Sequence, residues 1–397
     1  MDCLNYEKAR LGPLFSEWLL IILININHQV AMDNTDKTPA KINLPGRLGN
    51  EEMTLRTDPR TDPRMLDGLV AVGLDGRGDA PPVTLDSPLD QLFEFISGME
   101  LFFQKVIQDC FSNLPPVNGV VSRIETITGS DGNEISLFIH HPEKMDGPLP
   151  CVFHTHGGGM VILSAECDNF VRWRNDLAAT GMVVVGVEFR NGGGALGNHP
   201  FPAGLNDCAS GLNWVFENRE ELGVSHIVIS GESGGGNLAI STTMKAKEEG
   251  WLDRVAGVYA QCPYIYGLYS NPPSELCSLF ENNGYMFDTD SMAILAKLYD
   301  PDGENSRNPL AWPYHASVEE LAGLPPHVIS LNELDPLRDE GFLFHQKLLN
   351  AGGSSVCRTL NGTCHAADIL FIKNIPDIYD STICDIRSFA GKLSEQN

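Results

Sequence analysis

The chain has 397 residues, of which 42% are hydrophobic and 20% are charged. This composition is that of an ordinary globular protein, and it excludes a collagen-like, coiled-coil or extensively disordered chain. The formal net charge of −25 repels phosphate backbones, so a nucleic-acid partner is not expected.

The first 31 residues are interpreted as a leader that is non-native or weakly ordered. The apolar run at 18–24 is too short to span a bilayer, so no stable membrane insertion is expected. Three interpretations remain open: a docked helix, a weak anchor, or a stretch translated ahead of a second start at Met32.

Residues 32–116 are predicted to form an N-terminal extended segment followed by a helical cap. Proline recurs through 33–64 and forbids a long helix there. Between 89 and 111, apolar and aromatic residues recur at helical spacing, which predicts an amphipathic helix. Its aromatic face either packs against the body or walls a substrate pocket, and the two roles are compatible.

Residues 117–397 alternate between strand and helix patterns. The continuous apolar runs of the middle strands are typical of parallel strands buried on both faces. We therefore predict an α/β fold with a mostly parallel, doubly wound, eight-stranded sheet. An aromatic-rich insertion at 264–315 interrupts the alternation. Strands are expected at 120–128, 134–141, 150–155, 182–189, 226–231, 255–262, 326–332 and 355–360, and helices at 165–180, 204–221, 234–248, 288–299, 337–351 and 377–393.

The strongest chemical signal is Gly231-Glu232-Ser233-Gly234-Gly235, which matches Gly-x-Ser-x-Gly. It stands between an apolar strand and a helix, the context of a nucleophile elbow. Ser233 is the candidate nucleophile, and the Gly234 N–H is a candidate oxyanion donor. Glu232 either shapes the elbow or is a spacer. A dinucleotide site is a weaker interpretation, because no acidic residue ends a following strand at the required distance.

A second motif, His156-Gly157-Gly158-Gly159, follows the strand at 150–155. Glycines there expose backbone N–H groups, so Gly158 and Gly159 are predicted to complete an oxyanion hole. His156 is expected to hold the shape of the loop. His154 and His156 also stand two apart, as in some zinc sites, but the sequence offers no further ligands.

A nucleophilic serine needs a base and an acid that orients the base. His365 follows the last strand, and Asp335 lies at the turn after the strand at 326–332. Both are therefore expected at the same edge of the sheet as Ser233. Glu333 and Asp339 are the alternative acids. His327, in an expected strand, and His345, in an expected helix, are interpreted as structural.

From about 117 to 395 the chain resembles the α/β-hydrolases of the hormone-sensitive-lipase family, the microbial His-Gly-Gly-Gly esterases. The resemblance includes this motif, the segment 199–203, the elbow, the segment 335–340 and His365. It implies an N-terminal helical cap over the pocket. The chain departs from the family at the elbow, which is usually Gly-Asp-Ser-Ala-Gly, at 189–194, and after His365.

These motifs predict a serine carboxylesterase that hydrolyses short-chain acyl or aryl esters without a metal or cofactor. An amidase or deacetylase using the same triad is an alternative, and a non-catalytic small-molecule receptor is another. The expected partner is a small-molecule ester, and a homodimer is left open. None of the ten cysteines forms a Cys-x-x-Cys pair, which indicates a reducing, cytoplasmic location.

Overall fold

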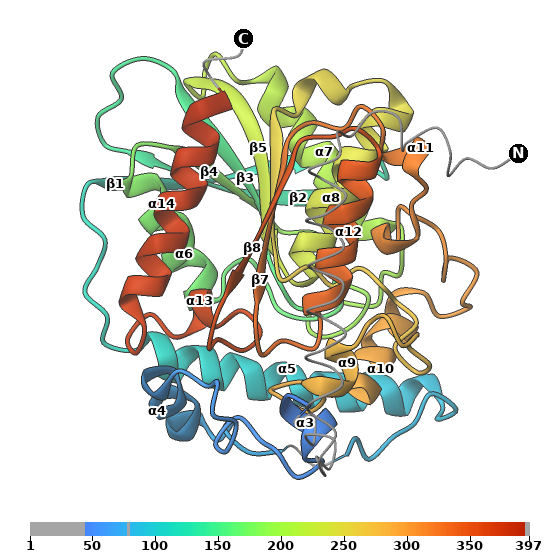
Figure 1. Cartoon of the computed structure of the whole chain (residues 1–397). Helices are drawn as coiled ribbons and strands as arrows, with labels where there is room; N and C mark the ends of the chain where they lie inside the picture. Colours follow the sequence, from blue (N-terminus) through green and yellow to red (C-terminus); the bar gives the residue numbers. More distant parts are fainter. Residues whose placement is uncertain (1–43, 78–79, 394–397) are drawn as a thin grey trace, which may run out of the picture. The chain divides into compact units, whose positions relative to one another are not determined.

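A computed structural model describes residues 44–77 and 80–393 (Figure 1). The predicted leader at 1–31 lies outside these residues. Residues 45–397 form one compact unit, so the cap and the catalytic body belong together. The boundary between 116 and 117 stays a prediction. In the described chain no helix is long and apolar enough to cross a membrane.

Eight strands form one sheet in the order β1-β2-β4-β3-β5-β6-β7-β8. β1 pairs with β2 and β2 with β4 in antiparallel fashion, and all other neighbours are parallel. This confirms the predicted mostly parallel α/β-hydrolase sheet. The strands are β1 (Val120–Thr128), β2 (Glu134–Pro142), β3 (Leu149–Thr155), β4 (Val183–Val187), β5 (Val224–Glu232), β6 (Gly257–Gln261), β7 (His327–Asn332) and β8 (Ser355–Leu360).

Burial along the strands explains their sequences. Every residue of β4, β6 and β7 is buried, as continuous apolar runs require in a sheet covered on both faces. β1 is an edge strand and is mostly exposed. The centre of the sheet is therefore buried. The two loops that carry the motifs follow β3 and β5, which lie in this centre.

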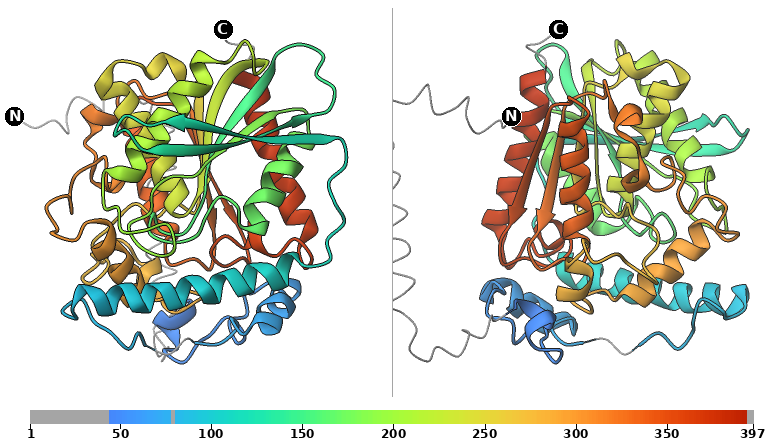
Figure 2. Two further views of the ribbon diagram at one scale, coloured as in Figure 1. Left: turned by 180° about the vertical axis from the view of Figure 1, so that it is seen from behind. Right: turned by 45° about the vertical axis from the view of Figure 1, so that its right-hand side comes forward.

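Helices cover both faces of the sheet (Figures 1 and 2). On one face lie α6 (Asp168–Ala179) and α14 (Pro376–Leu393), where Trp173 packs edge-on against Tyr379. On the other face lie α7 (Ala203–Glu217), α8 (Gly234–Glu249) and α12 (Arg338–Asn350). This is the doubly wound arrangement that the sequence predicts.

The cap helix α5 (Leu89–Phe111) runs across the end of the sheet at which β3 and β5 finish, and contacts α4, α6 and α10 (Figures 1 and 2). α4 (Pro63–Val72) was not predicted from the sequence, although Asp62 caps it, Pro63 opens it and Gly73 ends it in the left-handed region. The remaining helices are α3 (Gly46–Gly49), η1 (Leu252–Arg254), α9 (Ser278–Glu281), α10 (Thr289–Tyr299), η2 (Pro313–His315), α11 (Val318–Leu321) and α13 (Ala367–Leu370).

Candidate active site

Ser233 lies at the turn between β5 and α8, with φ of 57° and ψ of −120°. A non-glycine residue in this region is strained, and such strain is a feature of nucleophile elbows. The turn is tight because Gly235 approaches the end of β3. A Cβ atom on Gly235 would lie 1.9 Å from the carbonyl oxygen of Thr155, so no side chain fits there.

The loop after β3 brings backbone N–H groups to the elbow. Gly158 has φ of 111°, and a Cβ atom on it would lie 2.0 Å from the carbonyl oxygen of Ile162, so this position requires glycine. Across the described residues, the N–H groups of Gly158, Gly159 and Gly234 have no hydrogen-bond partner. A Cβ atom on Gly234 would lie only 2.7 Å from the Gly159 nitrogen. The three free donors are therefore gathered beside Ser233.

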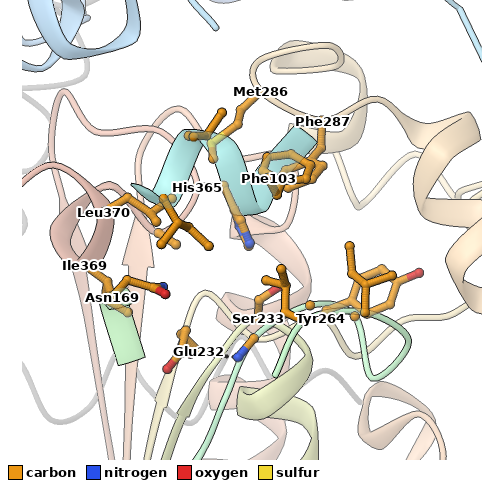
Figure 3. A pocket seen from close by; sticks show the side chains of 18 of the residues that line it. Phe103, Asn169, Glu232, Ser233, Tyr264, Met286, Phe287, His365, Ile369 and Leu370 are labelled. Carbon is orange, nitrogen blue, oxygen red and sulfur yellow. Dashed lines mark hydrogen bonds between the residues drawn. The ribbon is translucent and has the colours of Figure 1, made fainter. Parts of the chain in front are cut away.

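Glu232 connects the elbow to this loop. Its Oε1 accepts a hydrogen bond of 2.7 Å from the Gly157 N–H, which Figure 3 shows as a dashed line. Its Oε2 lies 3.0 Å from Nε2 of His154. Burial lowers the pKa of His154 even though the Glu232 carboxylate opposes the shift. Glu232 is therefore more than the spacer that the sequence allowed.

His154 and His156, the two histidines of the alternative zinc interpretation, each contact other groups. His154 points Nε2 at Glu232, whereas His156 donates from Nδ1 to the Gly157 carbonyl oxygen at 2.7 Å. The ring of His156 stacks on Phe189 with centroids 4.2 Å apart. His156 thus fixes the first turn of the glycine loop.

His365 and Asp335 come from the loops after β8 and β7 and form a buried pair. Nδ1 of His365 lies 2.8 Å from Oδ2 of Asp335, and Oδ1 of Asp335 accepts from the Leu337 N–H at 2.9 Å. Burial favours the neutral imidazole, yet the Asp335 carboxylate and the neighbouring Cys262 together outweigh burial and raise the pKa of His365 well above its ordinary value. The rings of Phe287 and His365 form a T-shaped pair with centroids 5.3 Å apart.

The imidazole of His365 faces Ser233 across the cavity (Figure 3). In the described site no hydrogen bond joins Ser233 Oγ to His365, and such bonds are often formed only once substrate is bound. The alternative acids are used elsewhere: Glu333 accepts from the Gly362 N–H, and Asp339 accepts from the Ser278 N–H.

Two supporting residues escaped the sequence analysis. The Asn282 side chain donates to the carbonyl oxygens of Glu333 and Asp335, each at 3.1 Å, and so braces the turn that carries the acid. Cys262 is buried at the end of β6, and its sulfur lies within 4.8 Å of the ligand atoms of Asp335 and His365. Burial raises the pKa of the Cys262 thiol. Neither residue belongs to a motif, so only the fold reveals it.

These groups open onto a cavity of about 90 Å³. The walls of the cavity are apolar apart from a few side chains, and α5 supplies one wall (Figure 3). The segment 264–315 contributes the wall beyond Ser233. Residues lining the cavity include Phe103, Val106, Ile107, Ile162, Leu163, Phe170, Tyr264, Met286, Phe287, Met292, Leu295, Ile369 and Leu370.

Known proteins are similar to this chain in sequence and in fold. A family model described as the alpha/beta hydrolase fold matches residues 152–369, more than half of the chain. An arylesterase of Saccharolobus solfataricus is 29% identical over 238 residues, which is 59% of this chain and 72% of the relative. A carboxylesterase of Mycobacterium tuberculosis is 32% identical over 244 residues, again 59% of this chain and 72% of the relative.

The solved structures extend the similarity to the cap. Brefeldin A esterase, described as a bacterial homologue of human hormone-sensitive lipase, is 46% identical with a TM-score of 0.87, covering 89% of this chain and 99% of that one. Another solved esterase is 37% identical with a TM-score of 0.76, covering 85% and 99%. The chain therefore belongs to the α/β-hydrolase fold family, within its hormone-sensitive-lipase group, and is a carboxylic-ester hydrolase.

Proposed function

We propose that the protein is a serine carboxylesterase for short-chain acyl or aryl esters, with Ser233 as nucleophile, His365 as general base and Asp335 as the orienting acid. The observation that carries the proposal is the buried Asp335–His365 pair facing a strained Ser233 beside three unpaired N–H groups. This combination supplies a nucleophile, a base and an oxyanion site together.

In the first half of the reaction, His365 Nε2 takes the Ser233 proton as Oγ attacks the ester carbonyl. The Asp335 carboxylate holds the Nδ1–H tautomer and stabilises the imidazolium that forms. The N–H groups of Gly158, Gly159 and Gly234 receive the negative charge on the carbonyl oxygen. The tetrahedral intermediate then collapses, the ester C–O bond breaks, and His365 returns the proton to the leaving alcohol.

In the second half, water replaces the alcohol. His365 removes one proton from this water as its oxygen attacks the acyl-enzyme carbonyl, and the same N–H groups stabilise the second intermediate. Collapse breaks the bond to Ser233, the serine oxygen regains its proton from His365, and the carboxylic acid leaves. The residues that carry both halves are the same, so no further group is required.

The cavity favours small substrates. A volume of about 90 Å³ with aromatic walls accommodates a short acyl chain or a ring better than a long chain. We also propose a cytoplasmic location, since all nine cysteines of the described chain are free thiols, including Cys357 and Cys364. The proposed partner is a small-molecule ester. Native mass spectrometry would distinguish a monomer from a homodimer.

The test is hydrolysis of p-nitrophenyl acetate, butyrate, octanoate and laurate by the wild type and by Ser233→Ala. Activity that falls with chain length and drops by roughly 10⁴-fold or more in the variant is expected. Ser241→Ala, a buried serine farther along α8, is the matched control. Equal activity of Ser233→Ala and wild type would refute the assignment, and turnover of anilides but not esters would indicate an amidase.

A further inference from the structure

One polar side chain in the cavity has a hydrogen-bonding group that the protein does not use. Asn169 is the second residue of α6, and its side chain is buried, with 2% of the residue exposed. Within the described part of the chain its Oδ1 has no hydrogen-bond partner. Figure 3 shows the amide pointing from α6 into the cavity, on the wall shared with Ile369.

The other polar side chains that line the cavity are accounted for. Glu232 is bonded to the Gly157 N–H and faces His154, His365 is bonded to Asp335, and the Tyr264 hydroxyl donates to the Met292 carbonyl oxygen. Ser233 is the proposed nucleophile. Asn169 is therefore the polar lining residue without an assigned partner or reaction.

A structural role does not explain the amide. Asn169 lies in the first turn of α6, yet the start of this helix has no side-chain cap. Asparagine is a weaker helix former than leucine, and a buried amide without a partner destabilises the folded state. Leucine has nearly the same shape and would suit the apolar wall. An unpaired amide in a binding cavity is instead typical of a group that orients a ligand.

We infer that Asn169 is a specificity residue whose amide hydrogen-bonds a hydroxyl group of the substrate, so that the preferred esters are hydroxylated away from the scissile carbonyl. This rests on the proposed esterase function of Ser233. The buried Oδ1 needs a donor, and the apolar walls disfavour a charged one. A hydroxyl both donates and accepts, so it suits the amide whichever way its oxygen and nitrogen are turned.

The experiment uses pairs of esters that differ by one hydroxyl. On the acyl side, ethyl hexanoate is compared with its 3-hydroxy, 4-hydroxy and 5-hydroxy forms. On the alcohol side, hexyl acetate is compared with the acetates of hexanediols. Initial rates in a pH-stat give kcat/KM for each ester with the wild type and with Asn169→Leu. Asn169→Ala, which leaves space instead of an apolar group, is the second variant.

For at least one pair, the wild type is expected to prefer the hydroxylated ester by roughly ten- to a hundredfold, and both variants should bring this ratio to about 1. Ile369→Val is the matched control, because it changes the same wall without changing a hydrogen-bonding group, and it should keep the preference.

Two results would separate the hypotheses. If the wild type hydrolyses the plain esters but its hydroxyl preference is absent, or is the same in Asn169→Leu, the role of Asn169 is overturned and the esterase function stands. If the folded wild type hydrolyses none of the esters, the proposed function is overturned, and the specificity role with it.

Discussion

Glu232 connects the proposed nucleophile elbow to the loop proposed to hold the oxyanion. Its two carboxylate oxygens contact the Gly157 N–H and His154, which belong to the loop and to β3 respectively. The side chain touches none of the atoms that react in the proposed mechanism, so it is a positioning residue. Its effect on catalysis should appear in kcat rather than in substrate binding.

We expect Glu232→Ala to lower kcat by roughly tenfold to a hundredfold with little change in KM, less than the loss of an oxyanion donor itself. Glu232→Gln should keep most of the activity, because its amide oxygen can still accept the Gly157 N–H. Steady-state kinetics on p-nitrophenyl butyrate would measure both. Glu248→Ala, exposed on α8, is the control, and equal kcat for all variants would remove Glu232 from this role.

In the proposed mechanism the acidic limb of the pH–rate profile reports on His365, since only the neutral imidazole can take the serine proton. Asp335 raises the pKa of His365, so the imidazole stays protonated to higher pH than a free histidine does. We expect kcat/KM to rise with pH, with a half-point above pH 6.5. Asp335→Asn should lower kcat by roughly 10³–10⁴-fold and move this limb to lower pH. A wild-type half-point below 6.5 would contradict the assignment.

Among the elements, α5 determines how much room the substrate has. Phe103 projects from this helix into the cavity and stacks on Phe287, with centroids 5.1 Å apart. Phe287 in turn contacts the ring of His365. The cap helix therefore reaches the proposed catalytic base through two aromatic rings, and we expect it to limit the length of the acyl chain.

Phe103→Ala should enlarge the cavity and raise the ratio of octanoate to acetate hydrolysis by roughly tenfold. The neighbouring Phe102 is 46% exposed, so Phe102→Ala on the same helix should leave the ratio as it is in the wild type. Separate measurements of kcat/KM on the two p-nitrophenyl esters give the ratio. A ratio that shifts equally in both variants would show a general loosening of the helix instead.

Among the elements, strands and helices with a regular residue pattern were predicted from the sequence. Features that depend on contacts between segments far apart in the chain were missed. The strands at 120–128 and 355–360 were predicted residue for residue, because stretches rich in β-branched residues and flanked by glycine turns are explicit in the sequence. α4 was missed since prolines mask its start. The roles of Asn282 and Cys262 were missed because β6 and the segment after α9 meet the catalytic turns only in the folded chain.

Across the whole molecule, the charge state of one buried carboxyl links stability to pH. Glu340 is fully buried in α12, where its Oε1 accepts from the Ile265 N–H and the Tyr269 hydroxyl. Burial raises the pKa of Glu340 to about 8. The unfolded chain loses this proton near the ordinary value of 4.5, so between pH 4.5 and 8 the folded state holds more protons and is destabilised as pH rises.

Glu340→Gln should remove this dependence. The amide oxygen can keep the same acceptor contacts without a charge, so we expect the variant to gain in Tm relative to the wild type, by a few degrees at pH 8 and by much less at pH 5. Differential scanning calorimetry at the two pH values would measure it. Glu319→Gln, exposed on α11, is the control. A difference in Tm that is the same at both pH values would refute the titration of Glu340.

The contact between Gly234 and Gly159 has an evolutionary consequence. Relatives with alanine after the nucleophile need room for a methyl group where this chain has the backbone of the neighbouring loop. Introducing that alanine here should damage the enzyme unless the residues after His156 change with it. We therefore expect the two loops to behave as an epistatic pair, so that grafting either one from a homologue succeeds only when both are transferred.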